Sequence, residues 1–341
     1  MGIEFKKKLL QWYRKHGRHT LPWRHTDDPY HILVSEIMLQ QTQVDRVIPK
    51  YHAFLKRFPT LQKLAKAPAS AVLRAWQGMG YNRRALYLKR LAEICVKDHG
   101  RRVPDTYEAL RALPGIGDYT ANAVLSFAFN KPVALYDTNI RRIFSRVFFG
   151  KNPSVIEERR IADVIANSLF LSLPGLRHSR HQVGEGRGTK QSLSNKKRLP
   201  RPEQNTSGLA MTGSAAYHSA LMDLGATVCK TQPMCGICPL REICKVGKRN
   251  LDPRDLKKLD GRVVRNPQSK FEGSDRQLRG RIIDLLRKEK QASMNTIASF
   301  LFLSLPGVTP KQSLPRIESI IQTLLRDGLI IKKGEVYALP K

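Results

Sequence analysis

The chain has 341 residues, of which 41% are hydrophobic, enough for roughly two to three domains with cores of their own. Lys and Arg number 60 against 28 Asp and Glu, and the resulting formal charge of +32 favours a polyanionic partner such as nucleic acid. No apolar run approaches the ~18 residues of a membrane-spanning helix, and the N-terminus lacks a signal-peptide cleavage pattern. We therefore expect a soluble cytoplasmic protein that has no membrane partner.

Residues 5–149 are predicted to be entirely helical. Apolar side chains recur there at helical spacing, and no run shows the period of two that is typical of a strand. Helix starts are predicted where a capping side chain or a proline precedes an apolar series, at residues 26–30, 67–70 and 104–106. Short Pro- or Gly-containing connections between these helices indicate a bundle.

Two carboxylates in this region lie among apolar neighbours. Glu36 stands in the sequence SEIMLQQTQV, and Asp137 in LYDTNI. A partly buried glutamate has a raised pKa and can donate a proton, while a second carboxylate can stabilise a cationic sugar, as in glycoside cleavage. Taken one at a time, each residue is better explained as a helix cap or as one partner of a surface ion pair.

The sequence LPGIGDYTA at residues 113–121 predicts a hairpin between two amphipathic helices. Gly115 and Gly117 permit a tight turn and leave backbone N–H groups open. Helix N-terminal amides without intruding side chains bind phosphate, so such a hairpin would hold a DNA backbone without reading its sequence. The motif alone is weak evidence, because many helix-to-helix turns contain Pro and Gly.

Residues 176–208 are basic, contain Gly and Pro, and carry almost no large apolar side chains, which predicts a surface insertion. The sequence LFLSLPG at 169–175 recurs at 301–307, and KQSL follows the two copies at 190–193 and 311–314. We interpret the repeat as a small insertion element tolerated at two surface connections. Coincidental helix-end chemistry is the alternative.

Four of the five cysteines form the series Cys229-x5-Cys235-x2-Cys238-x5-Cys244, which can hold a [4Fe–4S] cluster. Zinc is the alternative ligand. Zinc ribbons usually place two close Cys pairs on separate knuckles, whereas only one close pair exists here, so the spacing favours iron and sulfur. The fifth cysteine, Cys95, is expected to be a core residue.

Residues 247–273 are polar and basic without periodicity, and are predicted to be a linker after a catalytic region at 1–246. Residues 274–341 contain three amphipathic helical segments and a short terminal hairpin, the order of a winged helix-turn-helix. The second copy of the repeated segment lies between the second and third of these helices. The expected fold class is therefore all-α, with a small C-terminal α+β unit.

Taken together, these motifs resemble the MutY adenine DNA glycosylases of the helix-hairpin-helix glycosylase superfamily. The resemblance covers roughly residues 5–168 and 214–246. It implies two subdomains with the active cleft between them, one a helical bundle with the hairpin, the other joining the first helix to the cysteine segment. The matching pieces are LPWR at 21–24, DPY at 28–30, SEIMLQQTQV at 35–44, WQGMGY at 76–81, LPGIGDYTA at 113–121, DTN at 137–139 and ALMDLGA at 220–226.

The resemblance implies catalytic roles for four residues. Glu36 would be the general acid that protonates adenine, and Asp137 would stabilise the oxocarbenium-like sugar. Asn139 and Tyr119 would support that centre. Related bifunctional enzymes place a nucleophilic lysine at the position of Tyr119, and since a phenol cannot form a Schiff base, the resemblance implies a monofunctional enzyme.

The resemblance also implies how DNA is bound. Gln41 would enter the base stack as the target nucleotide is flipped out, and Tyr81, Gly115 and Gly117 would contact the duplex. The expected partner is double-stranded DNA with a mismatched adenine, bound by a monomer, and the expected cofactor is a [4Fe–4S] cluster. The family's usual Gly-Tyr-Tyr ends in Asn82 here, which puts one intercalation contact in doubt.

Two further departures concern the cysteines and the C-terminus. The first spacer between cysteines has five residues where the family usually has six. The family's Nudix-like domain, which recognises 8-oxoguanine opposite adenine, is not visible, so preference for the oxidised base is less secure than adenine removal. A thymine-mismatch glycosylase of the same superfamily and a non-catalytic iron–sulfur DNA-binding regulator are the alternatives.

Overall fold

The computed structural model describes residues 2–151, 213–249, 271–302 and 310–341. The predicted insertion at 176–208 lies outside the described residues, as do the first copy of the repeated segment and most of the second. None of the helices in the described ranges is long and apolar enough to cross a membrane.

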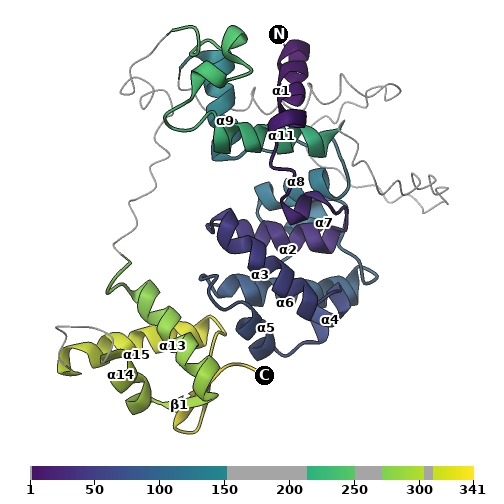
Figure 1. The fold of residues 1–341 in the computed structure, drawn as a ribbon. Coiled ribbons are helices and arrows are strands. Elements are labelled where there is room, and N and C mark those ends of the chain that lie inside the picture. Colours follow the sequence, from purple (N-terminus) through teal and green to yellow (C-terminus); the bar gives the residue numbers. More distant parts are fainter. Residues whose placement is uncertain (1, 152–212, 250–270, 303–309) are drawn as a thin grey trace, which may run out of the picture.

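A bundle of short helices forms the central part of the molecule (Figure 1). Asp28 caps one helix by accepting a hydrogen bond from the Tyr30 amide at 2.8 Å, and Thr106 caps another by accepting from the Ala109 amide at 3.3 Å. A third helix begins directly after Pro68, so all three predicted helix starts are confirmed. The elements are η1 (Pro22–Arg24), α2 (Pro29–Leu39), α3 (Val44–Arg57), α4 (Leu61–Lys66), α5 (Ala69–Ala75), α6 (Arg83–Asp98), α7 (Tyr107–Arg111) and α8 (Asp118–Phe127).

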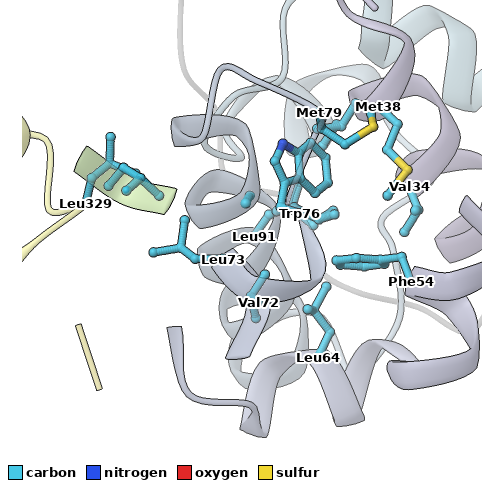
Figure 2. Close-up of a cluster of buried hydrophobic side chains, with 14 of the residues drawn as sticks. Val34, Met38, Phe54, Leu64, Val72, Leu73, Trp76, Met79, Leu91 and Leu329 are labelled. Atoms are coloured by element: carbon cyan, nitrogen blue, oxygen red, sulfur yellow. The ribbon is translucent and has the colours of Figure 1, made fainter. Parts of the chain in front are cut away.

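The core of this bundle surrounds Trp76 (Figure 2). Phe54 packs against the indole edge to face, with ring centroids 5.9 Å apart at 84°. Val34 and Met38 of α2 belong to the same cluster and are fully buried. Each large apolar side chain buried in this way contributes roughly 1.5–3 kcal/mol. Because α2 is buried along most of its length, the position of Glu36 on that helix is fixed by the core.

The second subdomain joins the first helix to the segment with the cysteines (Figure 1). Phe5 and Phe144 pack with centroids 5.5 Å apart in a core that also contains Leu224. The predicted helical fold with two subdomains is therefore confirmed for the described residues. Its elements are α1 (Gly2–His16), α9 (Thr138–Phe144), the π-helix η2 (Ser145–Phe149), α11 (Ser214–Thr227), η3 (Cys235–Ile237) and η4 (Arg241–Ile243).

The C-terminal unit is a helical unit with a small antiparallel sheet, as predicted for a winged helix. The sheet contains one more strand than the expected hairpin, because Gln291–Ser293 pairs with the last strand, and the strand order is β1-β3-β2. Ile282 and Ile321 lie in its core. The elements are α13 (Asp275–Glu289), β1 (Gln291–Ser293), α14 (Met294–Phe302), α15 (Pro310–Arg326), β2 (Ile331–Lys333) and β3 (Val336–Ala338).

Candidate active site and cysteine pocket

Glu36 lies on α2 and is only 7% exposed. Burial raises the pKa of its carboxyl to about 7, because the charged form loses its hydration. The charge of Arg24 lowers this pKa, and the nearby Asp137 raises it. The side chain therefore holds a proton close to neutral pH, which is the property that the sequence interpretation required of a general acid.

Asp137 is the N-cap of α9. Its carboxylate accepts a hydrogen bond from the Ile140 amide at 2.7 Å and another from Asn139 Nδ2 at 3.2 Å. Burial raises the pKa of Asp137, and these hydrogen bonds, together with the charge of Arg142, oppose that shift. Burial raises the pKa of both carboxylates, but only at Asp137 do hydrogen bonds to the charged form oppose that rise.

Asn139 connects the cap to α11. Its side-chain oxygen accepts from Arg142 Nη2 at 2.7 Å, and the same arginine donates to the Gly225 carbonyl at 2.8 Å. A Cβ on Gly225 would lie 2.6 Å from Asn139 Cβ, so only glycine lets the two helices approach this closely. This contact explains the glycine of the ALMDLGA sequence and fixes Asn139 beside Asp137.

Tyr119 lies on α8, and its hydroxyl donates to Met222 Sδ at 3.6 Å. Burial raises its pKa well above the ordinary value, and the charges of Glu36 and Asp137 raise it further. Glu36, Asp137 and Tyr119 therefore act on one another electrostatically, so the structure brings three of the four predicted catalytic side chains into one site. Asn139 joins them through its hydrogen bond to Asp137.

Arg24 and Asp223 are site residues to which sequence reasoning assigned no role. Asp223 is fully buried and accepts from Arg24 Nη2 at 3.2 Å and from the Arg18 amide at 2.8 Å. Arg24 also donates to the Tyr13 hydroxyl at 3.0 Å. The network holds a positive charge close to Glu36 and ties α1 and α11 to the bundle. Both residues stand in quoted motifs, but their pairing depends on contacts between distant segments.

Arg84 joins the two loops that contain Gln41 and Tyr81. Gln41 has φ +58° and Tyr81 has φ +45°, conformations that L side chains adopt rarely. The Arg84 guanidinium donates to the Met38 carbonyl at 3.0 Å and to the Met79 carbonyl at 3.1 Å, so it fixes the end of α2 to the turn before Tyr81. Sequence reasoning missed this residue.

The predicted hairpin forms between α7 and α8. Gly115 has φ +80°, and a Cβ there would lie 2.9 Å from Tyr87 Cβ, so glycine is required on both grounds. Gly117 precedes α8, and a Cβ there would meet open space. Asp118 follows and pairs with Arg111 at 2.6 Å. Gly117 therefore places no side chain of its own against the first amides of α8, as the sequence analysis expected.

The four spaced cysteines line one apolar pocket. Cys235 begins η3, and Cys229, Cys238 and Cys244 follow the ends of α11, η3 and η4. Cys229 Sγ lies 3.6 Å from Arg146 Nη1, and Cys244 Sγ accepts from the Gly247 amide at 3.2 Å. No group of three or more His, Cys, Asp or Glu in the described part of the chain is placed to hold a metal ion. Cys95 lies in the core of the bundle, as expected.

Comparisons with known proteins agree with this geometry. Residues 34–167 match the HhH-GPD superfamily of base excision DNA repair proteins. An adenine DNA glycosylase of Mycolicibacterium smegmatis is 34% identical over 95% of this chain and 91% of its own. That of Mycobacterium tuberculosis is 36% identical over 82% of this chain and 77% of its own. The chain belongs to the adenine DNA glycosylase family.

Similarity within the adenine DNA glycosylase family extends to animals, where the human protein is 33% identical over 72% of this chain and 40% of its own. Among solved structures, a thermostable thymine-DNA glycosylase superposes with a TM-score of 0.54 and 26% identity, covering 72% of this chain and 95% of that one. Endonuclease III in a non-covalent DNA complex gives a TM-score of 0.50 at 20% identity, which supports the fold alone.

Proposed function

We propose that this chain is a monofunctional base-excision glycosylase that hydrolyses the N-glycosidic bond of adenine mispaired with guanine or 8-oxoguanine. The observation that carries the proposal is the pair of coupled carboxylates: Glu36 is buried with a pKa of about 7, and Asp137 is hydrogen-bonded as a helix cap. Membership in the adenine DNA glycosylase family supports adenine as the base.

The chemistry follows from the environments of these residues. Glu36 gives its proton to a ring nitrogen of the base as the bond from that base to C1′ breaks, so the base leaves as a neutral molecule. Positive charge then develops on the sugar, and the Asp137 carboxylate stabilises it electrostatically. Water adds its oxygen to C1′, and the proton released restores the acid. Tyr119 contains no amine, so no Schiff base with the sugar forms and the DNA strand stays intact.

DNA binding is assigned to the loops and the hairpin. In this proposal Gln41 and Tyr81 approach the base stack from two loops that Arg84 holds together, and the turn at Gly115 and Gly117 binds a phosphate at the start of α8. The net charge of +32 favours such a complex with duplex DNA, which a monomer would form.

The test uses duplexes with a labelled strand that carry A:8-oxoguanine, A:G or T:G pairs, incubated with the protein and then treated with alkali. Adenine release is expected, with strand breaks appearing only after alkali. The T:G duplex addresses the second candidate, since a thymine-DNA glycosylase is among the structural neighbours. Thymine release without adenine release would favour that candidate, and breaks before alkali would contradict the assignment of Tyr119.

We expect adenine release from both A:G and A:8-oxoguanine duplexes, with only a small preference for the oxidised partner. The site residues described above are assigned to the removal of adenine, and none is assigned to the opposite base. Residues 274–341 form a winged-helix-like unit in the place of the family's Nudix-like domain, which recognises 8-oxoguanine. A good hydrogen-bonded contact to a base edge contributes roughly 1–3 kcal/mol. Without contacts from a Nudix-like domain, the ratio of the rates on the two duplexes should therefore fall by about 10- to 100-fold. Single-turnover rates on the two duplexes measure this directly, and a preference as large as that of relatives with the Nudix-like domain would contradict it.

The spacing of the four cysteines and their common pocket support an iron–sulfur cluster as the cofactor. Four thiols line one cavity, and burial raises the pKa values of Cys229 and Cys244. The positive charge of Arg146 beside Cys229 and the Gly247 amide that donates to Cys244 oppose this rise and favour the thiolate form. We propose that Cys229, Cys235, Cys238 and Cys244 hold a [4Fe–4S] cluster. When bound, the cluster would cross-link this segment through iron–thiolate bonds.

Protein purified without oxygen is therefore expected to contain about four irons per chain and to absorb broadly near ~400 nm. Cys235→Ala removes one ligand and should lower both signals. Cys95→Ala is the matched control, because Cys95 lies in the core of the bundle away from the pocket, and this variant should keep its iron. Stoichiometric zinc with no iron would overturn the assignment.

A further inference from the structure

The C-terminal unit packs against α5 and the start of α6. The Ser70 amide donates to the Pro340 carbonyl at 2.9 Å. Arg287 of α13 donates from Nε to the Leu73 carbonyl at 3.1 Å and from Nη2 to Asn82 Oδ1 at 2.9 Å. The apolar core is also shared, since residues of this unit belong to the same buried cluster as Leu73 (Figure 2).

Arg287 is a buried charge whose partners come from both units. Its side chain is 6% exposed, and it forms an ion pair with Asp284 on its own helix in addition to its bonds across the interface. At this low exposure the site is poorly hydrated, and burial therefore lowers the pKa of Arg287. Hydrogen bonds of a charged group are worth more than neutral ones in such surroundings, so the contact with Asn82 is a strong one.

A second contact lies one residue further along α6. Asp327 is 10% exposed and pairs with Arg83 at 3.6 Å, and Arg279 of α13 donates to the same carboxylate. The C-terminal unit therefore holds two successive residues, Asn82 and Arg83, at the point where the loop before α6 ends.

These two residues directly follow Tyr81. Its side chain is 41% exposed, and its φ of +45° is an unfavourable conformation that surrounding contacts must maintain. On one side, Arg84 bonds the carbonyls of Met79 and Gly80. On the other side, the C-terminal unit contacts Asn82 and Arg83. Asn82 occupies the position of the family's second tyrosine, and here it serves as the docking contact.

The charge on α15 gives little support to reading of a DNA groove by the winged helix. From Leu314 onward, the exposed positions of this helix carry Arg316, Arg326 and one acid, Glu318. Arg316 is paired with Asp275 at 2.7 Å. A helix that enters the major groove needs an excess of cations and base-reading side chains. The described face of α15 is almost balanced in charge.

We propose that the C-terminal domain is a positioning element for the loop of Tyr81: Arg287 and Asp327 fix Asn82 and Arg83, so that Tyr81 meets the base stack of duplex DNA in one geometry. The proposal rests on the DNA insertion included in the proposed function. In this role the C-terminal domain acts through the Tyr81 loop, and the winged helix does not need to contact the bases.

The test compares Arg287→Ala, Asn82→Ala and the double variant in the full-length protein. Two readouts are needed: the single-turnover rate of adenine release, and the fluorescence of 2-aminopurine next to a tetrahydrofuran abasic analogue, which reports insertion into the stack. Arg287→Ala should lower the rate and the fluorescence change by roughly 5- to 50-fold, given the strength of charged hydrogen bonds. The double variant should be no worse than Arg287→Ala alone, because that change already removes the bond to Asn82.

Lys288→Ala is the matched control. Lys288 is exposed on the same helix, so its loss removes an equal charge without touching the loop, and both readouts should stay at the wild-type level. A purely structural role of Arg287 would lower the melting temperature with both readouts unchanged in the folded protein, and that result overturns the proposal. Asn82→Ala keeps the test valid if Arg287→Ala does not fold. Wild-type insertion without adenine release would refute the proposed function and leave this inference standing, whereas no wild-type insertion signal would refute the inference.

Discussion

Replacing Glu36 with glutamine is expected to lower the single-turnover rate of adenine release by at least about 10²-fold while DNA binding stays near the wild-type level. Glutamine keeps the volume of the side chain but has no proton to transfer, and general acid catalysis contributes typically 10²–10⁴-fold. Glu93→Gln makes the same chemical change on the exposed face of α6, where Glu93 pairs with Lys89, and should leave the rate unchanged. Wild-type turnover by the Glu36 variant would refute the assignment.

The pH dependence of the wild-type rate has a defined sign. The acid works only when protonated, and the pKa of Glu36 is about 7, so the rate should fall as pH rises through about 7. The same pKa affects stability. It is raised above the unfolded value of 4.5, so the stabilisation is complete below pH 4.5 and is lost as pH rises to about 7.

The loss amounts to roughly 3 kcal/mol at pH 8, since each unit of pKa shift corresponds to about 1.4 kcal/mol. Glu36→Gln carries no charge and escapes this loss. The variant should therefore be more stable than the wild type at pH 8 and nearly equal to it at pH 4.5, as chemical denaturation at the two pH values would measure. Equal stability at both would show that the carboxyl is hydrated in the folded protein.

Much of the fold was predictable because its signals are local. Capping at Asp28 and Thr106 and the turn at Gly115 depend on neighbours in the sequence, and the structure places each of them as expected. The four spaced cysteines line one pocket, while their role as cluster ligands stays a prediction. Glu36 and Asp137 were identifiable only in their family motifs, because a lone carboxylate between apolar residues is more often a cap or an ion-pair partner.

The contacts that sequence reasoning missed are those between distant segments. Asp223 of α11 accepts from Arg24 of η1 although 199 residues separate them in the chain, and no spacing in the sequence predicts that pairing. In the sequence, Arg287 is one of several basic residues of an amphipathic helix. Its role is visible only in the structure, where it donates to the Leu73 carbonyl of α5. The third strand of the small sheet was missed for a related reason, since Gln291–Ser293 is too short to show a period and forms only by pairing with the last strand.

Asp137→Asn is expected to lower the rate of adenine release by about 10²–10³-fold with little change in stability. Asparagine is as good an N-cap as aspartate and keeps the acceptor for the Ile140 amide, so α9 should remain intact. What disappears is the negative charge that faces the developing cation, and removing one such preorganised group has an effect of this size. Asp28→Asn, the same change at the cap of α2, is the control and should keep the wild-type rate.

The residual activity of Asp137→Asn should also differ from that of the wild type in its pH dependence. The charge of Asp137 raises the pKa of Glu36, but burial is the larger cause. Removing that charge should therefore lower the pKa of Glu36 slightly, so that the fall in rate on the alkaline side begins at a lower pH than in the wild type. The pH–rate profiles of the two proteins measure the displacement. A fall that begins at the same or a higher pH would show that the two carboxylates do not act on each other, and that Asp137 contributes through α9 alone.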